Sequence, residues 1–125
     1  MAELHVEVVS AEREVWSGEA TQVLARTSEG DIGILPGHAP LLGALADGGV
    51  VRVLLSGGGE VVAAVHGGFL SVTEQGVTVL AEVAELSEDI DAPRARAALD
   101  RASGEDDVQA RRRAEGRLRA AGQPA

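Results

Sequence analysis

A chain of 125 residues with a formal net charge of −9 has the length of one domain, or of a small domain with an appendage. Because the chain contains no cysteine and no lysine, disulfides, thiolate metal ligands, cysteine nucleophiles, Schiff bases and a P-loop lysine are excluded. The acidic balance argues against binding to nucleic acid or anionic lipid, which requires a basic surface.

Two further features concern location. No apolar run approaches the roughly eighteen residues that a membrane-spanning helix needs. The first residues, Met1 to His5, include an acid and lead directly into an alternating pattern, so the basic start and apolar middle of a signal peptide are missing. We therefore expect a chain without a transmembrane segment that works in the cytoplasm.

Short apolar runs separated by glycine-rich turns fill residues 1–86. Leu4, Val6 and Val8 alternate with polar residues, which is the period of a half-buried strand. We expect Gly18 to break the second strand of the series and a single last strand over 77–83. About ten short strands without a helical period predict a β-sandwich or flattened barrel.

One loop within this region is unusually constrained. Pro36 and Pro40 bracket His38, and each proline fixes φ and removes a backbone donor. A rigid loop displayed by a sheet is a usual place for contact with a partner.

After Leu86 the pattern changes to a helical period. Small apolar residues recur at helical spacing after Pro93, and we expect Gly104 to end this first helix. Asp106 or Asp107 then caps a second helix. Residues 87–125 therefore predict an antiparallel two-helix hairpin, separate from the β region over 1–86. The expected apolar positions of the two helices are Ala92, Ala95, Ala98 or Leu99, and Ala102, and then Val108, Ala114, Leu118 and Ala121.

The hairpin has little apolar surface to hold it. Its larger apolar side chains are Leu99, Val108 and Leu118, each contributing about 1.5–3 kcal/mol if fully buried. Ordering each residue of the hairpin costs about 1–2 kcal/mol of backbone entropy. We therefore expect the hairpin to be stable only when docked, and a weakly held element of this kind can take two positions.

Charge is divided unevenly along the chain. Residues 1–86 hold twelve acids against three arginines, whereas residues 87–125 hold eight of each. The last eighteen residues carry five arginines against one acid, so the second helix is locally basic. A basic helix on an acidic body favours either an internal contact or an acidic partner.

Three segments, in order, resemble the epsilon subunit of rotary ATP synthases: Ser28 to Leu45, His66 to Val72, and Val77 to Glu82. The resemblance runs from about Leu4 to Leu118. It implies a β-sandwich with a mobile helical hairpin, in a non-catalytic rotor subunit of a proton-translocating ATP synthase on the cytoplasmic face of the cell membrane. The implied partners are the gamma subunit, the c-ring, and the alpha and beta subunits in an inhibited state.

The resemblance also implies partner-binding residues. Glu29 and Asp31 match a turn that faces the c-ring, and His38 matches a loop close to the gamma contact. The residues alone leave simpler alternatives open: Asp31 as an ordinary turn acid, and His38 bonded to its own backbone. Arg111 and Arg112 match a basic helix face that meets the catalytic subunits and blocks hydrolysis, although the second helix is short for that reach.

Some members of the family bind ATP as a regulatory ligand, with no cofactor required. The segment Ile90 to Ala95 matches their IDxxRA motif. Arginines spaced i,i+4 share one helix face and suit phosphate oxygens. The alternative is that Asp91 is a helix cap and that the arginines form a solvated face. The positions that match the nucleotide site are Glu85, Ile90, Asp91, Arg94, Arg101, Arg113 and Arg117.

Two other classes of function compare less well with the sequence. Catalysis or metal binding would have to start from His5, His38 and His66, which lack the spacing of a ligand pair, and neither GxSxG nor a P-loop motif is present. The remaining alternative is a stand-alone nucleotide-sensing β-sandwich.

Overall fold

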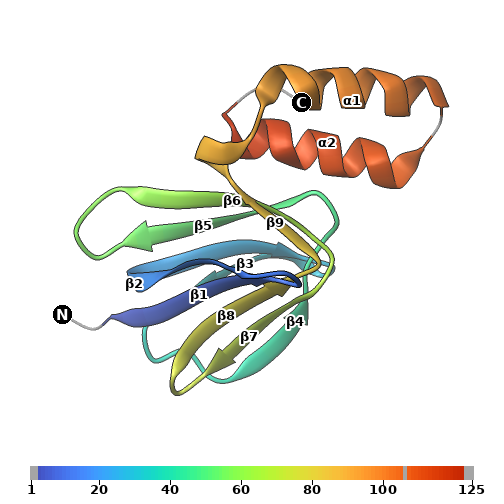
Figure 1. Ribbon diagram of the computed structural model, residues 1–125. Helices are drawn as coiled ribbons and strands as arrows, with labels where there is room; N and C mark the ends of the chain where they lie inside the picture. Colours follow the sequence, from blue (N-terminus) through green and yellow to red (C-terminus); the bar gives the residue numbers. More distant parts are fainter. Residues whose placement is uncertain (1–2, 106, 123–125) are drawn as a thin grey trace.

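The computed structural model describes residues 3–105 and 107–122, which form nine strands, a short 3-10 helix and two α-helices (Figure 1). The elements are β1 (Leu4–Ser10), β2 (Glu14–Thr27), β3 (Gly30–Ile34), β4 (Leu41–Ala44), β5 (Gly49–Leu55), β6 (Glu60–His66), β7 (Phe69–Thr73), β8 (Gly76–Ala81), β9 (Val83–Leu86), η1 (Ser87–Asp89), α1 (Ala92–Glu105) and α2 (Val108–Ala120).

The strands follow one another in the order β4-β7-β8-β1-β2-β5-β6-β9, with β3 beside the second half of β2. Neighbours are antiparallel except β1 and β8, which run parallel. The first half of β2 pairs with β1 and its second half pairs with β3 and β5. The strands therefore fold into two layers, with β1, β8, β7 and β4 in one and β5, β6 and β9 in the other (Figure 1). The predicted sandwich followed by two helices is confirmed.

The core between the layers is built mainly from valine. Alternate residues such as Val6 and Val8 of β1, and Val77 and Val79 of β8, are at most 1% exposed. Ile34 and Leu70 are the largest fully buried side chains of the strands. Branched aliphatic residues suit the pleated surface, so the two inward faces pack on aliphatic side chains, and the half-buried Trp16 packs against this core.

Two strand boundaries differ from expectation. Gly18 does not break β2, because it pairs with Val6 and the indole of Trp16 lies where a side chain would be, 2.7 Å from an ideal Cβ. The run over 77–83 divides at Glu82, where the chain leaves β8 and enters β9, which pairs with β6. Glu82 interrupts the apolar run there. A single acid at an outward position also fits a strand that continues, so Glu82 alone does not signal the change of partner.

The helical hairpin is present, with different limits from those expected. Gly104 does not end α1, since it is exposed within the helix and has open space at its Cβ position. Asp107 caps α2 by accepting a hydrogen bond from the Ala110 amide at 3.1 Å; Asp106 lies outside the described residues. Val108, expected to be buried, is 41% exposed. The buried residues of the helices are Ala95, Ala102, Ala114, Gly116, Leu118 and Ala120.

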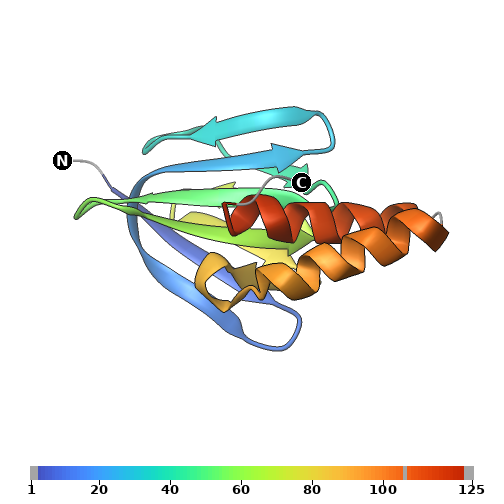
Figure 2. The same ribbon diagram turned by 90° about the horizontal axis from the view of Figure 1, so that it is seen from above.

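The hairpin lies on the outer face of the layer that contains β5 and β6, and α2 makes the contact (Figures 1 and 2). Strand β6 is consequently buried on both faces. Ala63 and Val65 belong to the sandwich core, whereas Ala64 and His66, on the opposite face, are buried outside that core. The hairpin thus forms a third layer.

Two glycines set the distance between α2 and the sheet. A Cβ on Gly116 would overlap the carbonyl oxygen of Gly48, and a Cβ on Gly48 would overlap the carbonyl oxygen of Arg112. The backbone of α2 therefore rests directly on the turn before β5. Glycine lowers helix stability by about 1 kcal/mol relative to alanine. At position 116 it nevertheless allows α2 to approach the sheet this closely.

We predict that Gly116→Ala displaces the hairpin from the sheet, because the added methyl group meets backbone that cannot move aside. Amide hydrogen exchange in α2 should rise to that of an undocked helix, while exchange in β1 and β8 stays slow. Gly104→Ala is the matched control, since it adds the same methyl group in open space and should stabilise α1 by up to about 1 kcal/mol. Unchanged protection of α2 in Gly116→Ala would contradict the role given to this contact.

Candidate functional site at the hairpin and sheet interface

An ion pair joins the hairpin to the strands. Arg117 of α2 donates from Nε to Oε1 of Glu85 on β9 at 2.6 Å. The two side chains are 29% and 31% exposed, so solvent screens the pair only in part. Glu85 pairs with Ala64 of β6, which places the contact on the outer face that α2 covers.

His66 is buried at the same interface. It is 4% exposed, and neither ring nitrogen has a hydrogen-bond partner among the described residues. Burial, aided by the positive charge of Arg117 and Arg113, lowers the pKa of His66 to about 4, while Glu85 and Asp47 act in the opposite direction. The imidazole is therefore neutral at physiological pH.

Five of the seven residues expected to bind nucleotide fall into two groups. Glu85, Arg113 and Arg117 meet at the interface between α2 and the sheet. Arg94 and Arg101 lie exposed on α1. The first group already contains an ion pair, so a phosphate that approaches Arg117 must replace or share the carboxylate of Glu85.

The start of the IDxxRA motif has a structural role in this chain. The Asp91 carboxylate accepts a hydrogen bond from the Arg94 amide at 3.0 Å, and its carbonyl oxygen accepts one from Ala95 at 2.9 Å. Asp91 is therefore the N-cap of α1. Ile90 precedes it and closes η1 through a bond from its amide to Ser87.

The arginines of α2 do not share one face. Arg113 and Arg117 are half-buried toward the sheet, whereas Arg111, Arg112 and Arg119 are exposed. Glu115 lies 3.6 Å from Arg111 and 3.4 Å from Arg119. The outward basic surface is thus smaller than the sequence predicts.

The expected partner-binding acids lie at the turn between β2 and β3. Glu29 is exposed there, and Asp31 forms a two-pronged contact with Arg26 at 2.8 and 3.1 Å. The hydrogen bonds from Arg26 hold the pKa of the Asp31 carboxyl below its usual range. Asp31 therefore stays ionised and is already paired within its own hairpin.

His38 adopts the simpler of the two arrangements considered from the sequence. Its Nδ1–H donates to the carbonyl oxygen of the next residue, Ala39, at 2.6 Å. The side chain is half-buried in the proline-bracketed loop. Nε2 remains the ring nitrogen available for a partner.

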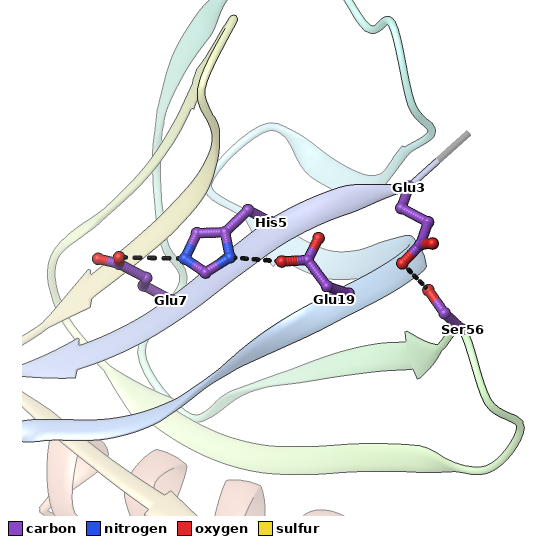
Figure 3. A network of polar contacts seen from close by, with 5 residues as sticks. All are labelled: Glu3, His5, Glu7, Glu19 and Ser56. Atoms are coloured by element: carbon purple, nitrogen blue, oxygen red, sulfur yellow. Dashed lines mark hydrogen bonds and ion pairs between the residues drawn. The ribbon is translucent and has the colours of Figure 1, made fainter. Parts of the chain in front are cut away.

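A cluster near the N-terminus was not expected from the sequence (Figure 3). His5 contacts Glu19 on β2 at 2.8 Å and Glu7 on its own strand at 3.3 Å. These hydrogen bonds raise the pKa of His5, and the bond to Glu19 has the larger effect. Beside them Ser56 donates to Glu3 at 2.9 Å. Within residues 3–105 and 107–122, no group of three histidines or acids is placed to hold a metal ion.

The other layer carries an exposed apolar patch, which consists of Leu42, Ala44, Phe69 and Leu80. Phe69 is 51% exposed, Leu80 is 50% exposed and Leu42 is 71% exposed. Phe69 stands between Ala44 on β4 and Leu80 on β8 in the strand register. The sequence signal for this apolar patch was that Phe69 and Leu80 occupy outward positions, which alternate with the buried positions of β7 and β8 and are usually polar. Adjacent exposed apolar side chains of this kind mark interaction surfaces.

Comparison with known proteins identifies the family. The family model of the ATP synthase delta/epsilon chain β-sandwich domain matches residues 3–87. The chain belongs to the ATP synthase epsilon chain family. It is 60% identical over 120 residues to the ATP synthase epsilon chain of Streptomyces coelicolor, and the aligned region covers 96% of each chain. It is 58% identical over 125 residues to that of Thermobifida fusca, covering 94% of this chain and 91% of the relative.

A solved structure agrees with this assignment to the epsilon chain family. A chain in the Euglena gracilis mitochondrial ATP synthase, in an assembly of OSCP, F1 and c-ring, superposes with a TM-score of 0.75 at 25% identity. The match covers 94% of this epsilon family member and 76% of the Euglena chain. Among the described residues, neither helix is long and apolar enough to cross a membrane.

We predict that Glu85 and Arg117 contribute jointly to hairpin docking, by about 1 kcal/mol or less because both are partly exposed. In a double-mutant cycle of Glu85→Gln and Arg117→Gln, measured by hydrogen exchange in α2, either single variant should weaken docking and the second change should add little. Arg26→Gln and Asp31→Asn form the control pair, whose ion pair lies in the β2–β3 hairpin and should not affect α2. Fully additive effects of Glu85→Gln and Arg117→Gln would show that the two side chains act separately.

Proposed function

We propose that the chain is a non-catalytic rotor subunit in the central stalk of a proton-translocating ATP synthase, on the cytoplasmic face of the cell membrane. The supporting observation is family membership across nearly the whole chain, in sheet and hairpin alike. The sandwich couples rotation of the c-ring to ATP synthesis by holding the gamma subunit and the c-ring together. The hairpin regulates ATP hydrolysis.

The gamma subunit docks on the apolar patch of Leu42, Ala44, Phe69 and Leu80. These side chains project from three paired strands, so they are held at fixed spacing. The hairpin occupies the outer face of the other layer, which leaves the apolar patch accessible while α2 is docked (Figure 1). Burial of an aromatic residue at the centre of such a surface commonly dominates the binding energy. The turn with Glu29 and Asp31 then faces the c-ring.

Co-purification of the full chain with gamma tests this arrangement. The wild-type chain should form a one-to-one complex, and Phe69→Gln should weaken it at least tenfold because a central apolar contact is lost. Val108→Gln is the matched control, since Val108 is also an exposed apolar residue but lies on α2. If the wild-type chain fails to bind gamma, the stalk assignment is wrong and the stand-alone nucleotide-sensing module is favoured.

The exposed arginines of α2 include Arg111 and Arg112. They contact the alpha and beta subunits of the catalytic hexamer when the hairpin leaves the sheet. With thirteen residues, α2 spans about 20 Å. This short reach supports weak inhibition of hydrolysis.

ATP is proposed as a regulatory ligand of the hairpin, bound weakly by Arg94 and Arg101 of α1 with Arg113 and Arg117 of α2. Calorimetry at millimolar ATP should show binding by the wild-type chain, and Arg101→Gln should reduce it severalfold because a guanidinium contact to phosphate is lost. Arg13→Gln, on the sandwich, is the control for charge. Absence of heat with the wild-type chain at millimolar ATP would remove the nucleotide from this proposal.

A further inference from the structure

His66 occupies a position in the fold that none of the proposed roles uses. It is the last residue of β6, on the face that points away from the sandwich core and toward α2. It is 4% exposed, and its two ring nitrogens have no hydrogen-bond partner among the described residues. A buried polar group without a partner lowers stability, so this side chain opposes the docking that covers it.

The surroundings of His66 tolerate only a neutral imidazole. Arg113 and Arg117 face it from α2, and both carry positive charge. Glu85 faces it from β9, but this carboxylate is already bonded to Arg117 at 2.6 Å. Asp47 faces it from the turn before β5. Glu82, between β8 and β9, places its side chain beside Gly67, the residue that follows His66. A proton added here places a third positive charge at an interface where the Glu85 carboxylate is already engaged by Arg117.

We propose that His66 is an acid-sensitive release for the hairpin: protonation of its imidazole drives α2 off the sheet. Undocking exposes the outer face of β6 to water, where an imidazolium is solvated and the repulsion from Arg113 and Arg117 is relieved. The device needs no other conformational change, because the sandwich core lies on the opposite face of the strand.

The direction of the pH dependence follows from linkage between protonation of His66 and docking of the hairpin. The pKa of His66 is about 4 when docked, against an ordinary value of 6.5 once the side chain is solvated. Docking is therefore strongest above pH 6.5 and weakens as the pH falls through 6.5 toward 4. The docking constant should fall about tenfold between pH 7.5 and 5.5, and by about 300-fold in the limit of low pH.

The use of this release in an ATP synthase rests on the proposed function, since only a stalk subunit presents its freed hairpin to the catalytic subunits. The docking equilibrium itself is a property of the isolated chain. Measuring docking without partners therefore separates a failure of this inference from a failure of the proposed function.

The experiment is amide hydrogen exchange on the full chain at pH 7.5, 6.5 and 5.5, corrected at each pH for the chemical exchange rate. Protection of the middle of α2 should fall about tenfold over this range, while the core strands β1 and β8 keep theirs. Global unfolding is a poor readout, because His5 acts in the opposite direction. Its raised pKa contributes stability below pH 6.5, and that contribution is lost as the pH rises through the raised value.

His66→Leu removes the titrating group and fills the site with an apolar side chain. In this variant the protection of α2 should be greater and independent of pH between 7.5 and 5.5. His38→Gln is the control, and should keep the wild-type pH dependence. A wild-type α2 whose protection is unchanged by pH, or a pH dependence that persists in His66→Leu, would overturn the proposal.

Two further measurements test the proposal if His66→Leu does not fold: the exchange of His66→Gln and an NMR titration of the wild-type imidazole. His66→Gln is polar but does not titrate over this range, so its α2 protection should also be independent of pH. An NMR titration of the wild-type imidazole should give a midpoint well below 6.5. A midpoint at or above 6.5 would refute the release mechanism whatever the variants do.

Discussion

The structure depends on the close approach of α2 to the turn before β5. Gly48 and Gly116 remove the two side chains that would separate helix and sheet, so backbone meets backbone. Once that distance is set, the small residues of α2 reach the outer face of β6, and Arg117 reaches Glu85. The position of the hairpin is therefore tied to the geometry of the sheet, because a methyl group added at either glycine would overlap backbone of the other element.

The two interfaces of β6 differ in kind. The inner face joins a continuous aliphatic core. The outer face offers alanine, one partly exposed ion pair, and a histidine without a hydrogen-bond partner in the part of the chain that the structure describes. Few large apolar side chains are buried on the hairpin side, so the free energy of docking is small compared with that of the sandwich. The two interfaces therefore give a firmly packed sandwich with a loosely held third layer, and the proposed regulation by the hairpin uses this difference.

Much of the fold could be predicted because its signals are local. Alternating valines identify the strands, and Asp107 caps α2 as its residue type suggests. Two features could not be predicted because they depend on partners distant in the sequence: the carbonyl of Gly48 requires Gly116, and the chain changes layer between β8 and β9 to pair with β6. The position of the Trp16 indole over Gly18 is local, but it depends on a side-chain conformation that the strand pattern does not specify. At the candidate site, the spacing of Arg113 and Arg117 was informative. The ion pair of Arg117 with Glu85, and the effect of both arginines on His66, depend on the sheet and could not be predicted.

Strand β2 belongs to both layers, since its fourteen residues pair with β1 at one end and with β3 and β5 at the other. A load applied to one layer therefore passes to the other along covalent bonds as well as through side-chain packing. Sliding of the layers past each other would have to stretch this strand or break ladders on both sides of it together. A sandwich whose two layers share one continuous strand therefore resists shear between them. Resistance to shear is what a subunit of a rotating stalk requires.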